Sequence, residues 1–169
     1  MKLVSTIKSL LQNKEEVNHH FIFIEAPSKL VAPEIILWGE ASWWPKKSSM
    51  RFVKKTEGDV RVGSRFEQQV RLPRGPKWDV EVTKLVPGEE AQIERTFLNG
   101  IFIGKESVAL ESRFNGTRVD YHMRCKIRGF INSLVWKFFF KGLHDKNIDM
   151  ILTALKDYVL HKQRKSHIQ

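Results

Sequence analysis

The sequence predicts a single α+β domain in which a curved antiparallel sheet of six to seven strands wraps around a long C-terminal helix, with two short helices after the first strand. Two patterns predict this arrangement. Residues 65–127 alternate apolar and polar side chains with a period of two, and turn sequences interrupt the alternation. Residues 130–160 then carry apolar side chains at steps of three and four, which is the spacing of one helix face.

Size and composition agree with one domain. The chain has 169 residues, 41% of them hydrophobic, which is enough to bury a core without disulfides or metals. We expect one domain over residues 1–169, with a helical extension at 1–16 and a flexible basic tail at 163–169. The lone Cys125 has no partner for an intramolecular disulfide. The N-terminus lacks the pattern of a secretory signal, and no uncharged apolar run approaches the roughly 20 residues that span a bilayer, so the expected location is the cytoplasm.

The segment before the alternating region predicts helices around one strand. Residues 3–11 have the apolar spacing of a short amphipathic helix, and residues 17–25 form a β-like run that ends at Ala26-Pro27-Ser28. The content of residues 30–45 indicates two short helices with a break near Pro33 or Gly39.

Two turn sequences set the predicted pairing of the strands. Asn-Gly at residues 99–100 and 115–116 favours two-residue type I′ turns, because both central positions need positive φ. The predicted partners are Phe97–Phe102, Arg95–Gly104, Ile93–Glu106, Ser112–Val119, Leu110–Tyr121 and Val108–Met123. The two predicted hairpins agree on one continuous inner face. Its residues are Ile93, Arg95, Phe97, Phe102, Gly104, Glu106, Val108, Leu110, Ser112, Val119, Tyr121, Met123, Cys125 and Ile127.

The last predicted element is a helix over residues 130–160. Its predicted apolar face contains Ile131, Leu134, Val135, Phe138, Phe139, Ile148, Ile151, Leu152, Leu155, Tyr158 and Val159. Gly142 interrupts it at a cost of about 1 kcal/mol relative to Ala, so we expect a bend or a close backbone approach there.

Several strings in the sequence resemble those of a known family. They are Ile24-Glu25-Ala26-Pro27 followed by Trp43-Trp44-Pro45, the run Asn115-Gly116-Thr117-Arg118-Val119-Asp120-Tyr121, and Leu143-His144, Asn147-Ile148 and Ala154-Leu155-Lys156 before Tyr158. With the element order, over roughly residues 17–160, they resemble the polyketide cyclase/dehydrase and lipid-transport family of the START and birch-pollen-allergen-like (SRPBCC) superfamily. The resemblance implies a helix-grip fold with a cavity between sheet and helix. That family includes cyclases, lipid carriers and proteins without an assigned activity, so the fold alone selects no function.

Arg95 is the most informative residue of the predicted inner face, because a buried charge needs a partner. Glu106 lies diagonally across the predicted hairpin, within reach of a long side chain. Two interpretations stay open: an internal ion pair at the cavity wall, or a pair that orients a polar group of a ligand. The residues expected to line the cavity are Arg95, Gln68, Phe66, Trp78, Phe97, Val108, Leu110, Tyr121, Met123 and Trp44.

Candidate catalytic residues lie on this face and on the predicted C-terminal helix. Tyr121, Glu106 and His144 are the groups that would handle protons in a cyclase-type reaction, although a tyrosine with an ordinary pKa near 10 needs tuning for that role. Neighbouring residues of a strand point to opposite faces, so His19-His20 does not form a ligand pair, and no third ligand accompanies it at metal spacing. We therefore expect no metal and no cofactor.

Three functions remain. The leading one is binding of a small hydrophobic ligand, lipid-like or similar to an aromatic polyketide, in the internal cavity. The first alternative is a cyclase or dehydratase acting on such a ligand. The second uses the net charge of +10 to bind RNA or an anionic membrane, and it predicts a steep salt dependence that cavity binding lacks. Of these surface partners we favour peripheral contact with an anionic membrane over nucleic acid, and we expect a monomer or a dimer.

Overall fold

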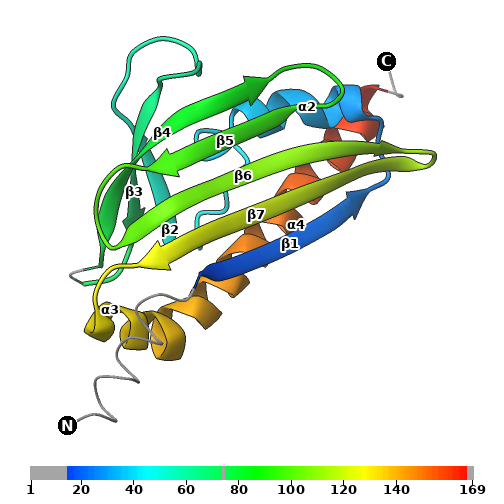
Figure 1. The fold of residues 1–169 in the computed structure, drawn as a ribbon. Helices are drawn as coiled ribbons and strands as arrows, with labels where there is room; N and C mark the ends of the chain where they lie inside the picture. The colour runs from blue at the N-terminus through cyan, green and yellow to red at the C-terminus, as the bar shows by residue number, and fades with distance from the viewer. Residues whose placement is uncertain (1–14, 74, 167–169) are drawn as a thin grey trace, which may run out of the picture.

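The protein is described from a computed structural model that covers residues 15–73 and 75–166 (Figure 1). The helix expected at residues 3–11 lies outside these ranges. Within them no helix is both long and apolar enough to cross a membrane.

A single antiparallel sheet makes up most of the domain, in the order β1-β7-β6-β5-β4-β3-β2. Its seven strands are β1 (Glu16–Ile24), β2 (Met50–Lys54), β3 (Arg65–Val70), β4 (Lys77–Val86), β5 (Gln92–Phe97), β6 (Phe102–Arg113) and β7 (Gly116–Ile127). The first strand, β1, forms one edge of the sheet and pairs with the last strand, β7. The second strand, β2, forms the opposite edge. The predicted α+β class and the curved sheet around a C-terminal helix are confirmed.

The helices differ from the prediction in detail. One helix, α2 (Ser28–Ile36), follows β1 and contains Pro33, and the chain from Leu37 to Trp44 then forms turns instead of the expected second helix. The predicted C-terminal helix has three parts, α3 (Phe130–Val135), the π-helix η1 (Trp136–Phe140) and α4 (Lys141–Ser166). The irregularity in the helix therefore lies before Gly142. The close backbone approach expected at Gly142 is also not found, because nothing lies within 4 Å of a Cβ added there. Since α4 continues to Ser166, the first residues of the expected flexible tail are helical.

The hairpin registers differ from the prediction by two residues. β5 ends at Phe97 and β6 begins at Phe102, so a wider loop replaces the two-residue turn and Arg95 lies directly opposite Glu106. Asn99 accounts for the wider loop, because its amide oxygen accepts the N–H of Asp79 at 2.7 Å and its amide nitrogen donates to the Asp79 carboxylate at 2.7 Å.

The second hairpin turns at Phe114 and Asn115, and Gly116 already belongs to β7. A Cβ on Gly116 would lie 2.2 Å from the carbonyl oxygen of Ile24, so this glycine serves the close approach of β1 rather than the turn. A slip of two residues keeps every side chain on its own face. The predicted inner face is accordingly buried, except that Ser112 is exposed and Gly104 is partly so.

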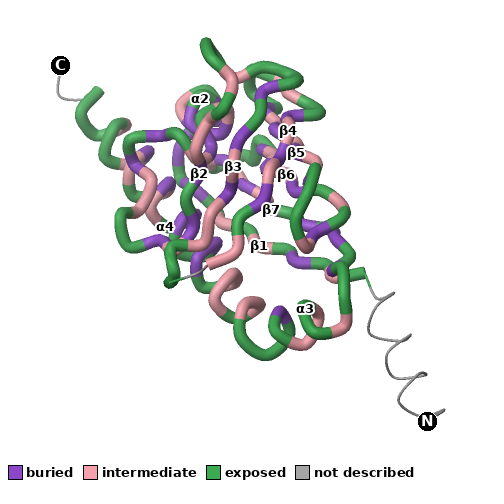
Figure 2. The backbone as a smooth tube through the Cα atoms, turned by 90° about the vertical axis from the view of Figure 1, so that its left-hand side faces the viewer, coloured by how far each residue is buried: buried purple, intermediate pink, exposed green. Residues whose placement is uncertain are grey.

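The core fills the space between the inner face of the sheet and α4. Apolar side chains from the sheet, α2 and α4 form one contiguous cluster, with Ile148, Ile151, Leu152, Leu155 and Val159 as the contribution of α4. The start of the C-terminal helical region does not contribute to this core as predicted, because α3 contains no buried residue (Figure 2). Four residues of the predicted apolar face are exposed: Ile131, Val135, Phe138 and Phe139. These residues have helical spacing, but the sheet ends before it covers them.

Candidate ligand-binding site

A buried polar network crosses the centre of the sheet and begins at Arg95. The guanidinium lies 4.9 Å from the ring centre of Phe66 and 5.1 Å from that of Phe52, and its Nη2 donates to the carbonyl oxygen of Trp38 at 2.5 Å. Its Nη1 is 3.6 Å from Oε1 of Glu106. Burial lowers the pKa of Arg95, and the Glu106 carboxylate opposes that shift. Because a guanidinium keeps its proton even so, the network contains a buried ion pair.

Glu106 is the centre of this network. Its Oε1 accepts from Gln68 Nε2 at 2.5 Å, and its Oε2 accepts from the Tyr121 hydroxyl at 3.2 Å. Gln68 in turn accepts from the indole N–H of Trp78 at 2.5 Å. With Arg95 beside it, the carboxylate therefore has partners on both oxygens, as a buried charge requires.

Tyr121 connects the sheet to the last helix. Its hydroxyl lies 3.2 Å from His144 Nε2. Burial raises the pKa of Tyr121 well above its ordinary value, and the neighbouring Glu106 carboxylate raises it further. The hydroxyl thus stays protonated and donates to Glu106, and His144 then donates from Nε2.

A small apolar pocket adjoins the His144 end of the network, with a volume of about 30 Å³. It is lined by Ser49, Met50, Val70, Trp78, Trp136, Phe140, Leu143, His144 and Asn147. Two of these residues carry buried polar atoms without a hydrogen-bond partner, Nε1 of Trp136 and Nδ1 of His144. Buried polar atoms are normally paired, so an unpaired donor and an unpaired ring nitrogen at one pocket mark a place where a ligand's polar group gains hydrogen bonds.

The structure distributes the predicted site residues over the pocket, the polar network and the apolar core. Trp78 and His144 line the pocket. Arg95, Gln68, Glu106 and Tyr121 form the network behind it. Five apolar candidates belong to the core cluster: Phe66, Phe97, Val108, Leu110 and Met123. Trp44 packs at its edge and donates its indole N–H to the carbonyl oxygen of Met50 at 3.2 Å. The small pocket is the described hollow that adjoins this network.

Of the nine residues that line the pocket, the sequence interpretation named only Trp78 and His144, and the most important omission is Trp136. A signal was present: Trp136, Phe140, Leu143 and Asn147 follow one another at helical steps and form a face distinct from the long apolar stripe. Trp136 and Asn147 are the buried members of that face, and Trp136 packs edge-on against Phe102 at 5.1 Å between ring centres.

The π-helix η1 has hollow space on two sides. Trp136 and Phe140 line the small pocket, while Lys137 lines a groove of about 370 Å³ that is also bordered by Glu16 and Ile127. A π-helical turn within an α-helix is strained and often accompanies a functional site. A shift of η1 toward the groove would enlarge the pocket.

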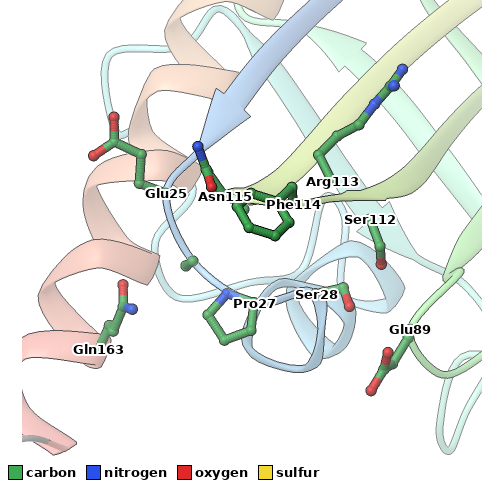
Figure 3. Close-up of a pocket in the computed structure, with 11 residues that line it drawn as sticks. Glu25, Pro27, Ser28, Glu89, Ser112, Arg113, Phe114, Asn115 and Gln163 are labelled. Carbon is green, nitrogen blue, oxygen red and sulfur yellow. The ribbon is translucent and has the colours of Figure 1, made fainter.

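The largest described hollow lies elsewhere. It measures about 400 Å³ and lies between the start of α2, the turn of the β6–β7 hairpin and Gln163 of α4 (Figure 3). It is open to solvent, and none of its residues belongs to the buried network. We therefore assign the candidate site to the small pocket.

Asp145, the neighbour of His144 on α4, makes stability depend on pH. Its carboxylate lies 3.9 Å from Nδ1 of His144 and 3.4 Å from Nε2 of His20, and it accepts a hydrogen bond from Asn18. His144 first, then Asn18 and His20, lower the pKa of Asp145 to about 2 against the opposing effect of burial. The folded-state pKa lies below the unfolded one, so the ionised carboxylate stabilises the fold above about pH 4, and this contribution is lost as the pH falls toward 2.

We expect Asp145→Asn to reduce the acid sensitivity of the fold. Urea unfolding between about pH 6 and pH 2.5 measures it: the free energy of unfolding of the variant should fall less steeply with pH than that of the wild type. Equal slopes for the two proteins would mean that Asp145 has no such role.

Comparison with solved structures agrees with the observed architecture. Norcoclaurine synthase from Thalictrum flavum, a point mutant in complex with a transition-state analogue, superposes with a TM-score of 0.67 at 12% identity over 89% of this chain and 97% of that one. KanY superposes with a TM-score of 0.65 at 15% identity over 86% and 98%, and the Aha1 dimer from Colwellia psychrerythraea with 0.58 at 18% over 85% and 96%. The fold is the helix-grip fold. No protein-family model matches the chain, and no curated protein does.

Proposed function

We propose that the protein binds a small hydrophobic molecule with one polar group at the pocket between η1, the start of α4 and strands β2–β4. The observation that supports this proposal is the pair of unpartnered buried atoms, Trp136 Nε1 and His144 Nδ1, at one apolar pocket. The indole N–H would donate to a carbonyl or hydroxyl oxygen of the ligand, and Nδ1 of His144 would form a hydrogen bond with a hydroxyl. Apolar burial would provide most of the affinity, about 25 cal/mol per Å².

Binding by this route requires the pocket to open. Its volume of about 30 Å³ equals the space of one water molecule, whereas ligand pockets usually measure about 300–1,000 Å³. The hollow on the far side of η1 gives Trp136 and Phe140 room to move away from Trp78 and Met50. The apparent affinity is then reduced by the fraction of molecules in the open state.

We also propose that the protein belongs to the polyketide cyclase/dehydrase and lipid-transport family. Norcoclaurine synthase, whose structure contains dopamine and hydroxybenzaldehyde, shares the fold at 13% identity in that complex. Of the family's functions we favour carriage over catalysis. A proton-transferring Tyr121 would need a lowered pKa, whereas burial and Glu106 raise it.

Titration with Nile red, an uncharged apolar dye that carries a carbonyl, tests the proposal. We expect saturable binding whose affinity falls about five- to tenfold in Trp136→Phe, which keeps the ring but removes the N–H donor. Trp44→Phe is the matched control, because its N–H is bonded to the Met50 carbonyl and the residue does not line the pocket. Leu143→Trp fills the pocket and should abolish binding. Unsaturable binding, or full binding by Leu143→Trp, would overturn the proposal.

A second function, peripheral contact with an anionic membrane, is supported by a different observation. Ile131, Phe138 and Phe139 are 74%, 69% and 73% exposed at one end of the molecule, which is unusual for large apolar side chains so close together. Lys137 lies among them, and the chain carries a net charge of +10. A helix with exposed aromatic residues and cations is typical of a segment that binds at a bilayer interface. Its location at η1 would deliver a lipid-like ligand directly to the pocket.

Vesicle flotation separates this second function from ligand binding alone. We expect binding to phosphatidylcholine vesicles that contain phosphatidylserine, and at least tenfold weaker binding by the double variant Phe138→Ser/Phe139→Ser. Phe114→Ser is the control, because Phe114 is fully exposed on the distant β6–β7 hairpin. Equal losses in the two variants, or equal binding to neutral vesicles, would contradict a role for this surface.

A further inference from the structure

Strands β1 and β7 bring two histidines and an aspartate together on the outer face of the sheet. His19 lies directly opposite His122, and Asp120 lies two residues before His122 on the same face of β7. The adjacent β1 residues Asn18 and His20 point the other way and bond to Asp145 and Asp149 of α4. The cluster is therefore separated from the pocket by the thickness of the sheet.

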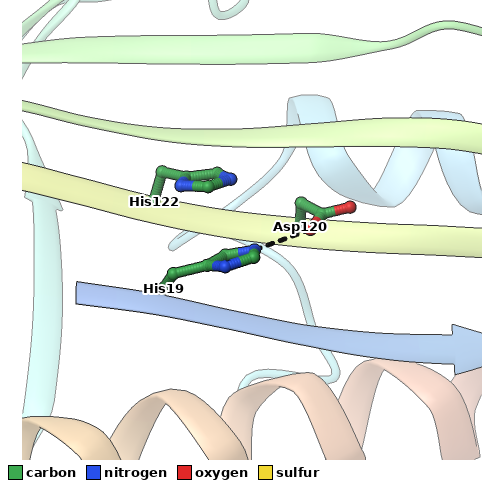
Figure 4. Close-up of side chains that lie close together, drawn as sticks. All are labelled: His19, Asp120 and His122. Atoms are coloured by element: carbon green, nitrogen blue, oxygen red, sulfur yellow. Dashed lines mark hydrogen bonds and ion pairs between the residues drawn. The ribbon is translucent and has the colours of Figure 1, made fainter. Parts of the chain in front are cut away.

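The geometry of the cluster suits coordination. Nε2 of His19 is 2.8 Å from Oδ1 of Asp120, and the His19 and His122 rings stack with centres 3.9 Å apart and planes 9° apart. One ligand atom from each residue lies within 4.8 Å of the others. In Figure 4 the two imidazoles extend in parallel from neighbouring strands and the carboxylate lies at their tips. Ligand atoms of a zinc site, each about 2.0–2.2 Å from the ion, lie about 3.4 Å apart, so side-chain rotations of modest size suffice.

We propose that His19, Asp120 and His122 bind a divalent transition metal of the zinc type. Two imidazole nitrogens and one carboxylate oxygen are borderline ligands that suit Zn²⁺, Ni²⁺ and Co²⁺ better than Mg²⁺ or Ca²⁺. Three protein ligands on an open strand surface leave further positions for water. The sequence interpretation excluded a metal at His19-His20 because it found no further ligand nearby in the sequence. Strand pairing provides two further ligands from β7, Asp120 and His122.

Arg118 is the group that opposes the metal. It holds Asp120 through two hydrogen bonds, Nε to Oδ2 at 2.8 Å and Nη2 to Oδ1 at 2.9 Å. Its positive charge would repel the ion, and its hydrogen bonds occupy the carboxylate. The site therefore has weak affinity as long as Arg118 is in place, and removal of this arginine should strengthen metal binding, which is unusual for a substitution beside a binding site.

Calorimetric titration of untagged full-length protein with Zn²⁺ tests the proposal, and the visible absorption of Co²⁺ reports the ligands. We expect one site, with at least tenfold loss of affinity in His19→Ala and in His122→Ala, and several-fold tighter binding in Arg118→Gln. His20→Gln is the matched control, because the neighbouring histidine points to α4, and it should bind as the wild type does. Unchanged affinity in His122→Ala, or weaker binding in Arg118→Gln, would overturn the assignment.

Discussion

Glu106→Ala is expected to lower the free energy of unfolding by about 3–5 kcal/mol, because it leaves a buried charge without its partner. Arg95 is 1% exposed and Glu106 3%, so water cannot replace the lost carboxylate. Gln68 and Tyr121 lose their acceptor at the same time. Urea unfolding followed by tryptophan fluorescence measures the loss.

A double variant without either charge separates the ion pair from simple loss of packing. The variant Arg95→Met/Glu106→Leu replaces both charges with apolar side chains of similar size, and such replacements of buried ion pairs are often neutral or stabilising. We expect it to be more stable than Glu106→Ala. A loss of less than about 1 kcal/mol in Glu106→Ala would show that the carboxylate is not needed to compensate Arg95.

Gly104→Ala is the second substitution with a large expected effect. A Cβ at this position of β6 would lie 2.1 Å from the carbonyl oxygen of Arg124 on β7, and the backbone φ of +144° disfavours any side chain. Backbone atoms cannot rotate away as a side-chain end does, so the paired strands β6 and β7 would have to separate. We expect a loss of at least about 2 kcal/mol in the free energy of unfolding.

Gly142→Ala provides the opposite case. This glycine lies in α4, and nothing lies within 4 Å of the added Cβ, so alanine should stabilise the helix by up to about 1 kcal/mol. Thermal unfolding of both variants should therefore shift in opposite directions. An unfolding temperature of Gly104→Ala that does not fall would contradict the close approach of β6 and β7, and one of Gly142→Ala that falls would contradict the open space beside Gly142.

The inner face of the sheet was predictable because side-chain alternation does not depend on the exact turn. The predicted hairpins were displaced by two residues, which changed the partners of Arg95 and Val108 but left both side chains facing inward. The turns themselves were not predictable from Asn-Gly alone. Asn99 bonds to β4, and Gly116 serves the contact with β1, so both residues have roles set by strands distant in sequence.

The candidate site was predicted only in part. Sequence patterns placed Arg95, Glu106 and Tyr121 together but did not reveal the small pocket beside His144, because its size depends on the distance between sheet and helix. Apolar spacing likewise predicted a buried face for Ile131 and Phe138, although both side chains are exposed. Trp136 was overlooked because it lies off that stripe.

The indole N–H signals in a proton–nitrogen correlation spectrum test the central claim most directly, because the chain has five tryptophans and Trp136→Phe identifies one signal. On addition of Nile red, the account predicts the largest shift for the Trp136 indole, as its unpaired N–H gains an acceptor. The Trp43 signal, whose N–H is bonded to Glu34 at 2.9 Å, should stay in place. Saturable dye binding that leaves the Trp136 signal unmoved would contradict the account.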